Sequence, residues 1–321
     1  MTAMLKILNV EPDEYSDEAR SILKGIGNLV EQNMERQELL QRIHEFNALI
    51  VRLNHQVDVE LMNAARDLKV IVSATTGLDH IDMEYAAKKN IAVLSLRGET
   101  KFLRSIPATA ELTWGLLLAL TRNIPSAHFS VLNGEWKRDR FKGHELARMR
   151  LGILGFGRIG EKVARYGSAF GMKVMAYDPY RNDANSGVEM KESLANLLGE
   201  SNILSIHVPL TQETENLISA KELNMMPRRS WLVNTARGAI VNEPALLDAL
   251  KSGHLAGAAL DVLSGERTKE NSLLIEYARM HSNLLLTPHI GGATYESMRA
   301  TEIFMANKLK DHFKRLISSI A

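Results

Sequence analysis

The chain of 321 residues contains no cysteine, which excludes disulfide bonds, thiolate metal sites and a cysteine nucleophile. It has little excess charge: 39 Lys and Arg balance 38 Asp and Glu, which argues against a nucleic-acid or anionic-membrane partner. No apolar run approaches the roughly 20 residues that a membrane span needs, and no basic segment precedes an apolar stretch at the N-terminus. We therefore expect a cytoplasmic protein with no metal site and no membrane or nucleic-acid partner.

The hydrophobic pattern indicates two α/β domains, because short aliphatic runs alternate with helical patterns along the whole chain. In the first third, strands are predicted at 5–10, 48–52, 70–74 and 91–96, and helices at 36–46, 83–89 and 108–120, the last broken by Asn123 and Pro125. From Leu151 the alternation is cleaner, with strands predicted at 151–155, 173–178, 202–207, 231–235, 256–261 and 284–287. Helices are predicted between them at 158–170, 191–198, 220–225 and 244–250. Six strands with helical crossovers are typical of a doubly wound parallel sheet that binds a dinucleotide.

A glycine-rich turn, G-x-G-x-x-G, links the strand from Leu151 to the helix that follows, with glycines at 155, 157 and 160. Such glycines permit a tight turn, a close approach of a pyrophosphate, and close packing of helix on strand. The pattern alone is weak, but Asp178 ends the next strand 18 residues after Gly160, where a ribose diol needs an acceptor. Its charge would repel a 2′-phosphate, which favours NAD, whereas Arg181 leaves NADP open.

Three residues of complementary chemistry follow the last three predicted strands: Arg237, Glu266 and His289. Ligands in open α/β sheets bind at the carboxyl ends of strands, so these side chains can converge on one site. Histidine can exchange a proton at neutral pH, a carboxylate can orient its ring, and a guanidinium can hold a carboxylate substrate. Taken singly, His289 could equally cap a turn, Arg237 could form a structural ion pair, and Glu266 could be a solvated charge. Together they indicate hydride transfer at a 2-hydroxy or 2-oxo acid, with the nicotinamide carrying the hydride.

At these residues the sequence resembles the D-isomer-specific 2-hydroxyacid dehydrogenases, and within that family it is most similar to the D-3-phosphoglycerate dehydrogenases. The resemblance rests on six motifs: LGILGFGRIG at 151–160, AYDP at 176–179, HVPLTQETENLI at 207–218, NTARGAIVNEPALLDAL at 234–250, AALDV at 258–262 and TPHIGGAT at 287–294. It implies a discontinuous fold, with residues 1–105 and 290–321 forming a flavodoxin-like substrate-binding domain and 106–289 forming the Rossmann NAD-binding domain. It also implies a homodimer formed through the helix and arm near 108–136.

Carried over by position, the resemblance implies Arg237 as substrate anchor, Glu266 as the partner of the histidine, and His289 as acid and base. The residues it implies for cofactor binding are Thr76, Gly155, Gly157, Arg158, Ile159, Gly160, Asp178, Val208, Thr235, Ala236, Asp261, Gly291 and Gly292, with Asp261 on the nicotinamide carboxamide. The backbone amides near Gly77 and Leu78 would hold the substrate carboxylate.

Two departures from the family pattern lie on the substrate side. Residues 97–107 form a longer and more basic stretch than usual, with Arg97, Lys101 and Arg104, and residues 267–271 replace a proline-rich turn after Glu266. Arg52 matches a position that faces a phosphate in the phosphoglycerate dehydrogenases. We therefore expect some of these cations to bind a second anionic group of the substrate, against the alternative of a solvated charged surface. The chain ends after the helix predicted near 301–316, so no regulatory extension is expected.

The substrate and the class of function remain open at this point. 3-Phosphoglycerate competes with glyoxylate, hydroxypyruvate and formate among the substrates, and the residues do not decide the physiological direction. An NADH-sensing scaffold or corepressor is the alternative from another class, which the intact Arg237, Glu266 and His289 disfavour.

Overall fold

The computed structural model describes residues 5–181, 183, 187–266 and 272–318. The chain divides into two compact units, the first comprising the chain up to Ile106 together with the stretch from Ala293 onward, and the second comprising Pro107–Gly292. The predicted boundaries, 105/106 and 289/290, differ mainly in placing residues 290–292. These residues belong with the second unit because the backbone N–H groups of Ile290 and Gly291 donate to the carboxylate of Asp261.

The first unit is a parallel sheet of five strands in the order β2-β1-β3-β4-β5. Its strands are β1 Leu5–Asn9, β2 Gly27–Glu31, β3 Ala48–Val51, β4 Val70–Ser73 and β5 Ala92–Ser95. Its helices are α1 Asp17–Lys24, α2 Arg36–Arg42 with the short η1 Ile43–Glu45, α3 Val59–Ala64, α4 Met83–Lys88, α5 Thr100–Leu103 and α13 Tyr295–Ser318. All residues of β3 and β4 are buried, as expected for central strands of a parallel sheet with helices on both faces.

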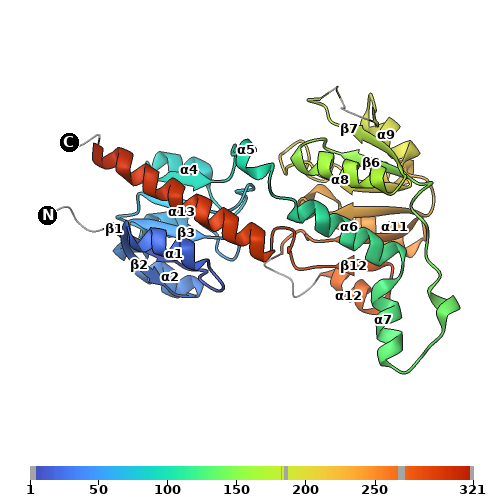
Figure 1. The fold of residues 1–321 in the computed structure, drawn as a ribbon, viewed down its shortest axis with the longest axis horizontal. Coiled ribbons are helices and arrows are strands. Elements are labelled where there is room, and N and C mark those ends of the chain that lie inside the picture. Colours follow the sequence, from blue (N-terminus) through green and yellow to red (C-terminus); the bar gives the residue numbers. More distant parts are fainter. Residues whose placement is uncertain (1–4, 182, 184–186, 267–271, 319–321) are drawn as a thin grey trace. The chain divides into compact units, whose positions relative to one another are not determined.

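The C-terminal helix completes the first unit, although it is almost 200 residues from β5 in sequence. Figure 1 shows α13 in red beside the blue N-terminal elements, where it packs on α1. Met305, Ala306 and Leu309 of α13 are buried in the same cluster as Ile7 and Leu23. The discontinuous organisation predicted from the sequence is therefore present.

The second unit is a parallel sheet of seven strands in the order β12-β11-β10-β9-β6-β7-β8. The strands are β6 Arg150–Leu154, β7 Lys173–Tyr177, β8 Val188–Met190, β9 Ile203–Ile206, β10 Ser230–Asn234, β11 Leu255–Leu260 and β12 Leu284–Leu286. The helical elements are α6 Ala108–Thr121, α7 Ile124–Leu132, η2 Arg138–Phe141, α8 Arg158–Ala169, α9 Leu194–Glu200, α10 Ala220–Met225, η3 Gly238–Ile240, α11 Glu243–Lys251 and α12 Leu273–Met280. The strand order reverses between β6 and β9, which is where such sheets bind ligands. The predicted class of doubly wound α/β sheets is confirmed.

Several short or irregular elements were not predicted. Strands β2 and β8 lie at sheet edges and are only partly buried, so they lack the aliphatic run of a central strand. Asn123, in the left-handed region at φ 54°, separates α6 from α7, and the chain becomes helical again at once. The basic stretch 97–107, for which no helix was predicted, contains α5, whose Phe102 stacks on Phe304 with 4.2 Å between ring centroids.

Helix α6 is apolar along most of its length because most of its residues pack inside the second unit, whereas Glu111 and Gly115 are exposed. Its buried residues include Trp114, Leu117 and Leu120, and it contacts α8, β10 and β11. Within the described residues, no helix combines the length and apolar character that a membrane crossing requires.

A nearly buried ion pair joins β3 to α13 in the first unit. The Arg52 guanidinium donates to Glu302 at 2.5 Å, and the Glu302 side chain is only 2% exposed. The other Glu302 oxygen accepts the Ser16 backbone N–H at 2.7 Å, and the Arg52 guanidinium lies over the Tyr15 ring. Burial raises the pKa of Glu302, and Arg52 opposes that rise. The charge of Arg52 is therefore balanced inside the protein.

We predict that Arg52→Ala lowers the free energy of unfolding by about 3 kcal/mol, because it leaves a buried carboxylate without its counter-charge. Losing Arg52 raises the pKa of Glu302 further, so the folded variant binds a proton that the unfolded chain releases. Its free energy of unfolding should therefore fall as the pH rises from about 5 to about 8. Urea denaturation at the two pH values measures both effects.

The matched control is Arg299→Ala. Arg299 lies on α13, the helix that carries Glu302, and pairs with Glu18 at 2.7 Å on the surface. That substitution should cost less than about 1 kcal/mol at either pH. Equal effects of the two substitutions would contradict the structural importance of the Arg52–Glu302 pair.

Candidate active site

The glycine turn between β6 and α8 is tightly packed at two of its glycines and open at the third. Gly155 has φ +89°, and a Cβ there would lie 2.8 Å from the carbonyl carbon of His207. A Cβ on Gly160 would lie 2.2 Å from the backbone oxygen of Gly155, so the helix packs directly on the turn. A Cβ on Gly157 would meet nothing within 4 Å. The turn therefore leaves open space where a pyrophosphate would approach.

The residues present fit a dinucleotide phosphate. Helix α8 runs for 12 residues from Arg158, and its N-cap Gly157 offers no side chain to its first N–H groups. Those donors and the positive end of the helix dipole suit an anion. Arg158 and Ile159 are the first two helical residues, and burial lowers the pKa of the Arg158 guanidinium.

Asp178 lies beside this turn because its carboxylate binds it. One oxygen accepts the Phe156 N–H at 2.9 Å, and the other accepts the Tyr180 N–H at 3.0 Å. The end of β7 is thereby joined to the glycine turn, and an acidic acceptor stands next to the phosphate-binding N-terminus. This is the arrangement expected for an adenosine ribose diol.

Arg181, the residue that left NADP open, has partners within the second unit. Its guanidinium donates to the Phe156 carbonyl at 2.8 Å, pairs with Glu161 and Asp183, and lies over the Phe156 ring. These contacts oppose its use as a ligand for a 2′-phosphate.

His289 and Glu266 are in contact, as predicted from their positions after neighbouring strands. The His289 Nδ1 lies 2.8 Å from a Glu266 oxygen, and the side chains are 25% and 33% exposed. The other Glu266 oxygen accepts the Leu263 N–H at 3.3 Å. A carboxylate on one ring nitrogen fixes the tautomer and leaves Nε2 to exchange a proton with a substrate oxygen.

The backbone of His289 is held in an unusual conformation by Asp261. His289 has φ 56°, a region that costs a non-glycine residue about 1 kcal/mol or more, and its N–H donates to the Asp261 carbonyl at 2.8 Å. The Asp261 carboxylate, 1% exposed, accepts the Thr287 hydroxyl and the N–H groups of Ile290 and Gly291 at 2.6–2.8 Å. Burial raises the pKa of Asp261, and these bonds lower it. Asp261 thus builds the turn that carries His289, while its predicted contact with a carboxamide stays a prediction.

Arg237 follows the carboxyl end of β10, the strand next to β11, and so lies at the end of the sheet where the loop with Glu266 begins. The buried Asn234 shapes its turn, with its side-chain oxygen accepting the Ala236 N–H at 3.0 Å and its amide donating to the Arg237 carbonyl at 2.8 Å. The Thr235 hydroxyl lies 2.9 Å from that of Thr113. Asn234 was not singled out from the sequence, although an amide at the end of an apolar strand was the available signal.

His207 is a second residue that the sequence reasoning did not assign. It follows β9 at the reversal of strand order, its N–H donates to the Leu154 carbonyl at 2.7 Å, and its Nε2 lies 2.8 Å from Ser205 Oγ. Burial lowers the pKa of His207 to about 3, so its ring is neutral at physiological pH. Val208 lies against the glycine turn, since a Cβ on Gly155 would be 2.8 Å from its Cγ1.

Gly292 is the last residue of the second unit, and the other remaining predicted residues lie in the first unit. Thr76, Gly77 and Leu78 form the loop after β4, where Thr76 is exposed and Leu78 is buried. Hydrogen bonds shape this loop: the Thr75 hydroxyl donates to the Gly77 carbonyl at 2.8 Å, and Ser73 Oγ lies 3.1 Å from the buried His80 Nε2. No group of His, Asp and Glu side chains suited to a metal ion occurs in the part of the chain that the structure describes.

The cations proposed for a second substrate anion are dispersed or engaged. Arg97, Lys101 and Arg104 are exposed around α5, and Arg52 is paired with Glu302. The prediction for Arg52 stays untested as a substrate contact, but its ion pair disfavours it. The departure at 267–271 lies outside the described residues.

Comparison with known proteins agrees with this geometry. Residues 114–291 match the family model for the NAD-binding domain of D-isomer specific 2-hydroxyacid dehydrogenases. A D-3-phosphoglycerate dehydrogenase of Methanocaldococcus jannaschii is 38% identical over 96% of this chain, which spans only 57% of that relative. A hydroxypyruvate reductase of Thermotoga maritima is 37% identical, with 95% of this chain and 96% of the relative covered.

Among solved structures, the D-lactate dehydrogenase of Aquifex aeolicus, complexed with NAD and lactic acid, matches with a TM-score of 0.84. It is 28% identical, and the match covers 98% of this chain and 97% of that one. The glycine turn, the acid after β7 and these matches together assign NAD as the cofactor.

We predict that Asp178→Asn weakens NADH binding by about 10-fold or more, because it removes a charged diol acceptor, and reduces the preference for NADH over NADPH. Fluorescence titration with the two reduced cofactors measures both changes. Arg181→Ala is the control, and it should leave NADPH affinity nearly unchanged because its guanidinium is tied to Glu161. Equal affinity of the unaltered protein for NADH and NADPH would contradict the role given to Asp178.

Proposed function

The chain belongs to the D-isomer specific 2-hydroxyacid dehydrogenase family, and from that premise we propose that it interconverts a small 2-hydroxy acid and its 2-oxo acid with NAD. The observation that carries the proposal is the 2.8 Å contact between His289 and Glu266, on the same unit as the cofactor turn. The pair is a proton donor and acceptor of the kind that oxidation of a C–OH group requires.

Each proposed role follows from the chemistry of the side chain and its fixed position. His289 Nε2 takes the proton from the substrate hydroxyl in oxidation and returns it to the carbonyl oxygen in reduction. Glu266 orients the ring and stabilises its protonated form. Arg237 binds the substrate carboxylate, and the backbone amides of Gly77 and Leu78 contribute to holding it. NAD, when bound, supplies the acceptor or donor of the hydride.

For the cofactor we propose contacts that follow the described turn. Gly155, Gly157, Arg158, Ile159 and Gly160 would hold the pyrophosphate, and Asp178 the adenosine ribose. The other proposed cofactor contacts are Thr76, Val208, Thr235, Ala236, Asp261, Gly291 and Gly292.

The identity of the acid is a finer proposal. The relative named D-3-phosphoglycerate dehydrogenase and the one named hydroxypyruvate reductase are about equally similar to this chain, at 38% and 37% identity. Both substrates carry the 2-hydroxy or 2-oxo carboxylate that Arg237 would hold. Arg52, the cation matched by position to a phosphate contact, is already paired with Glu302. The Arg52–Glu302 ion pair therefore supports a small substrate such as hydroxypyruvate or glyoxylate over 3-phosphoglycerate.

We also propose a homodimer. An exposed apolar surface on α7 and the arm that follows it supports this proposal. Ile124, Phe129 and Leu132 are 53%, 63% and 67% exposed, and Trp136 is 85% exposed. Beside them, a groove of about 390 Å³ is lined by Pro125 and Phe129 and by residues of α12. Helix α6, included in the expected dimer segment, is mostly buried within its own unit, so the proposed surface is α7 and the arm.

We predict that the unaltered protein oxidises NADH with at least one of glyoxylate, hydroxypyruvate and phosphohydroxypyruvate. His289→Gln should lower kcat by about 100-fold or more while NADH binding stays nearly normal, because only proton transfer is lost. Absorbance of NADH follows turnover, and titration follows binding. Cofactor binding without turnover on any 2-oxo acid would instead favour the NADH-sensing scaffold, and near-normal turnover by the variant would remove His289 from its role.

We predict that Phe129→Glu converts a dimer to a monomer, because it places a charge within an apolar contact. Light scattering on the eluting protein measures the mass. The control Tyr295→Glu changes an 84% exposed aromatic residue on the first unit and should leave the mass at twice that of one chain. A monomeric unaltered protein would sink the dimer proposal.

A further inference from the structure

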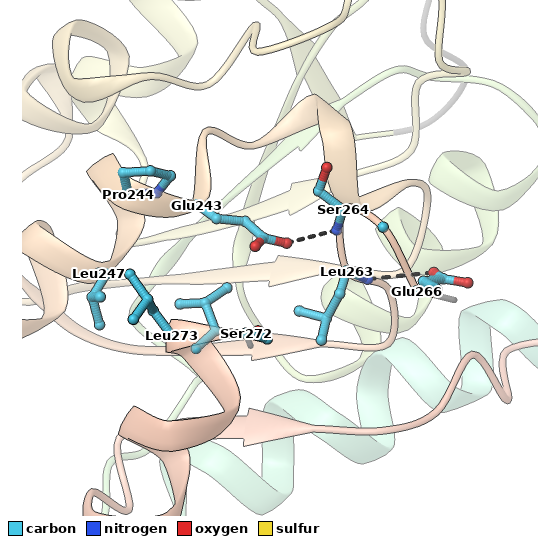
Figure 2. Close-up of a pocket in the computed structure, with 10 residues that line it drawn as sticks. Glu243, Pro244, Leu247, Leu263, Ser264, Glu266, Ser272 and Leu273 are labelled. Carbon is cyan, nitrogen blue, oxygen red and sulfur yellow. Dashed lines mark hydrogen bonds between the residues drawn. The ribbon is translucent and has the colours of Figure 1, made fainter. Parts of the chain in front are cut away.

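The loop that carries Glu266 is held from one side by the segment that follows Arg237. Helix α11 begins at Glu243, and the carboxylate of this first helical residue accepts the backbone N–H of Ser264 at 2.6 Å. Ser264 is two residues before Glu266. Figure 2 shows the Glu243 side chain reaching across to the Ser264 backbone, and the Leu263 N–H reaching Glu266 from the same loop.

A second contact fixes the same loop to the same segment. A Cβ on Gly238 would lie 2.0 Å from the carbonyl carbon of Leu263 and 2.3 Å from the Ser264 nitrogen, so the two backbones touch. Gly238 directly follows Arg237. Residues 237–243, which begin with Arg237, therefore contact the loop that carries Glu266 at two points.

The packing around the loop is incomplete on one side. A pocket of about 280 Å³ lies beside it, lined by Glu243 and Leu247 of α11, by Leu263 and Glu266, and by Leu273 of α12. Beside this space, a hydrogen bond from a backbone N–H to a carboxylate is a strong, directed contact that favours one loop conformation.

The Glu243 carboxylate is not needed to cap its own helix, because Asn242 does so. The Asn242 side chain accepts the Ala245 N–H at 3.0 Å. Burial raises the pKa of Glu243, and the bond from Ser264 lowers it. The Glu243 carboxylate, in the first turn of α11, therefore has a specific partner in the loop.

We infer that Glu243 is a positioning residue for Glu266: through the Ser264 N–H it holds the loop in the conformation that places the Glu266 carboxylate on His289. Its consequence for turnover rests on the proposed function. The geometric part concerns the loop alone and stands independently of which substrate is used.

The first experiment measures hydrogen exchange of the Ser264 and Leu263 amides by NMR in the full chain. Glu243→Ala should speed exchange of both amides by about 10-fold to 150-fold, since it removes a charge-assisted bond and frees the loop. Glu243→Gln keeps an oxygen that can accept the same N–H, so exchange should return close to that of the unaltered protein. Unchanged exchange of the Leu263 amide in Glu243→Ala would overturn the inference.

The matched control is Glu222→Ala, which also removes a carboxylate from the first turn of a helix in the same unit. Glu222 closes a capping box with Ser219 on α10. Its loss should destabilise the protein without selectively exposing the Leu263 amide. If Glu222→Ala raised Leu263 exchange as much as Glu243→Ala, the effect would be general destabilisation and the inference would fail.

The second experiment measures turnover with a 2-oxo acid and NADH. Glu243→Ala should lower kcat on the order of 10- to 100-fold, as for misplacement of a catalytic group by about 1 Å, with NADH affinity unchanged and Glu243→Gln rescuing most of the loss. In a Glu266→Gln background, Glu243→Ala should add little, because both changes remove one function.

The two experiments separate the possible failures. Additive losses in the double variant, or faster exchange with normal kcat, would overturn the positioning role. Absence of turnover in the unaltered protein would sink the proposed function, while the exchange measurements would still decide whether Glu243 holds the loop.

Discussion

The carboxylate of Asp261 stands at the end of β11, almost fully buried, where an unsatisfied charge would be costly. It is satisfied by the hydroxyl of Thr287 and by the N–H groups of Ile290 and Gly291, all from the turn after β12. Those bonds bend the chain so that His289 adopts a left-handed conformation with its ring on Glu266. The placement of the histidine, and the inclusion of residues 290–292 in the second unit, both depend on this one buried acid.

The same arrangement recurs at other loops that follow parallel strands. Glu11, buried in the first unit, accepts the backbone N–H groups of Arg52, Leu53 and Asn54 and so shapes the loop after β3. Asp178 accepts two N–H groups around the glycine turn, and Glu243 accepts that of Ser264. Loops after parallel strands have backbone donors without ladder partners, and a carboxylate supplies two acceptors in a defined direction. The acids thus give these backbone donors defined partners.

The ion pair of Arg52 with Glu302 shows that a residue matched by position to a substrate contact can have a partner within its own unit. A guanidinium after a strand is a plausible ligand for an anionic substrate, and the sequence pattern supports that interpretation. In the structure the Arg52 guanidinium pairs with a buried glutamate of α13, for which the loss of the counter-charge would be costly. The prediction that Arg52 contacts the substrate stays untested, and this ion pair disfavours it.

The parts of the fold and site that the sequence determined are those set by local pattern. Aliphatic runs predicted the central strands, and glycines 155, 157 and 160 predicted the turn. Because ligands bind at the carboxyl ends of parallel strands, the sequence also predicted Arg237, Glu266 and His289 at that end of the sheet. The edge strands β2 and β8 and the short helix α5 lack a strong period and were missed. Only the tertiary structure decided the partners of side chains: Glu302 for Arg52 across 250 residues, Thr287 for Asp261 across 26, and Ser264 for Glu243 across 21. A pattern of residue types defines which groups need a partner, whereas packing of distant segments decides which partner is within reach.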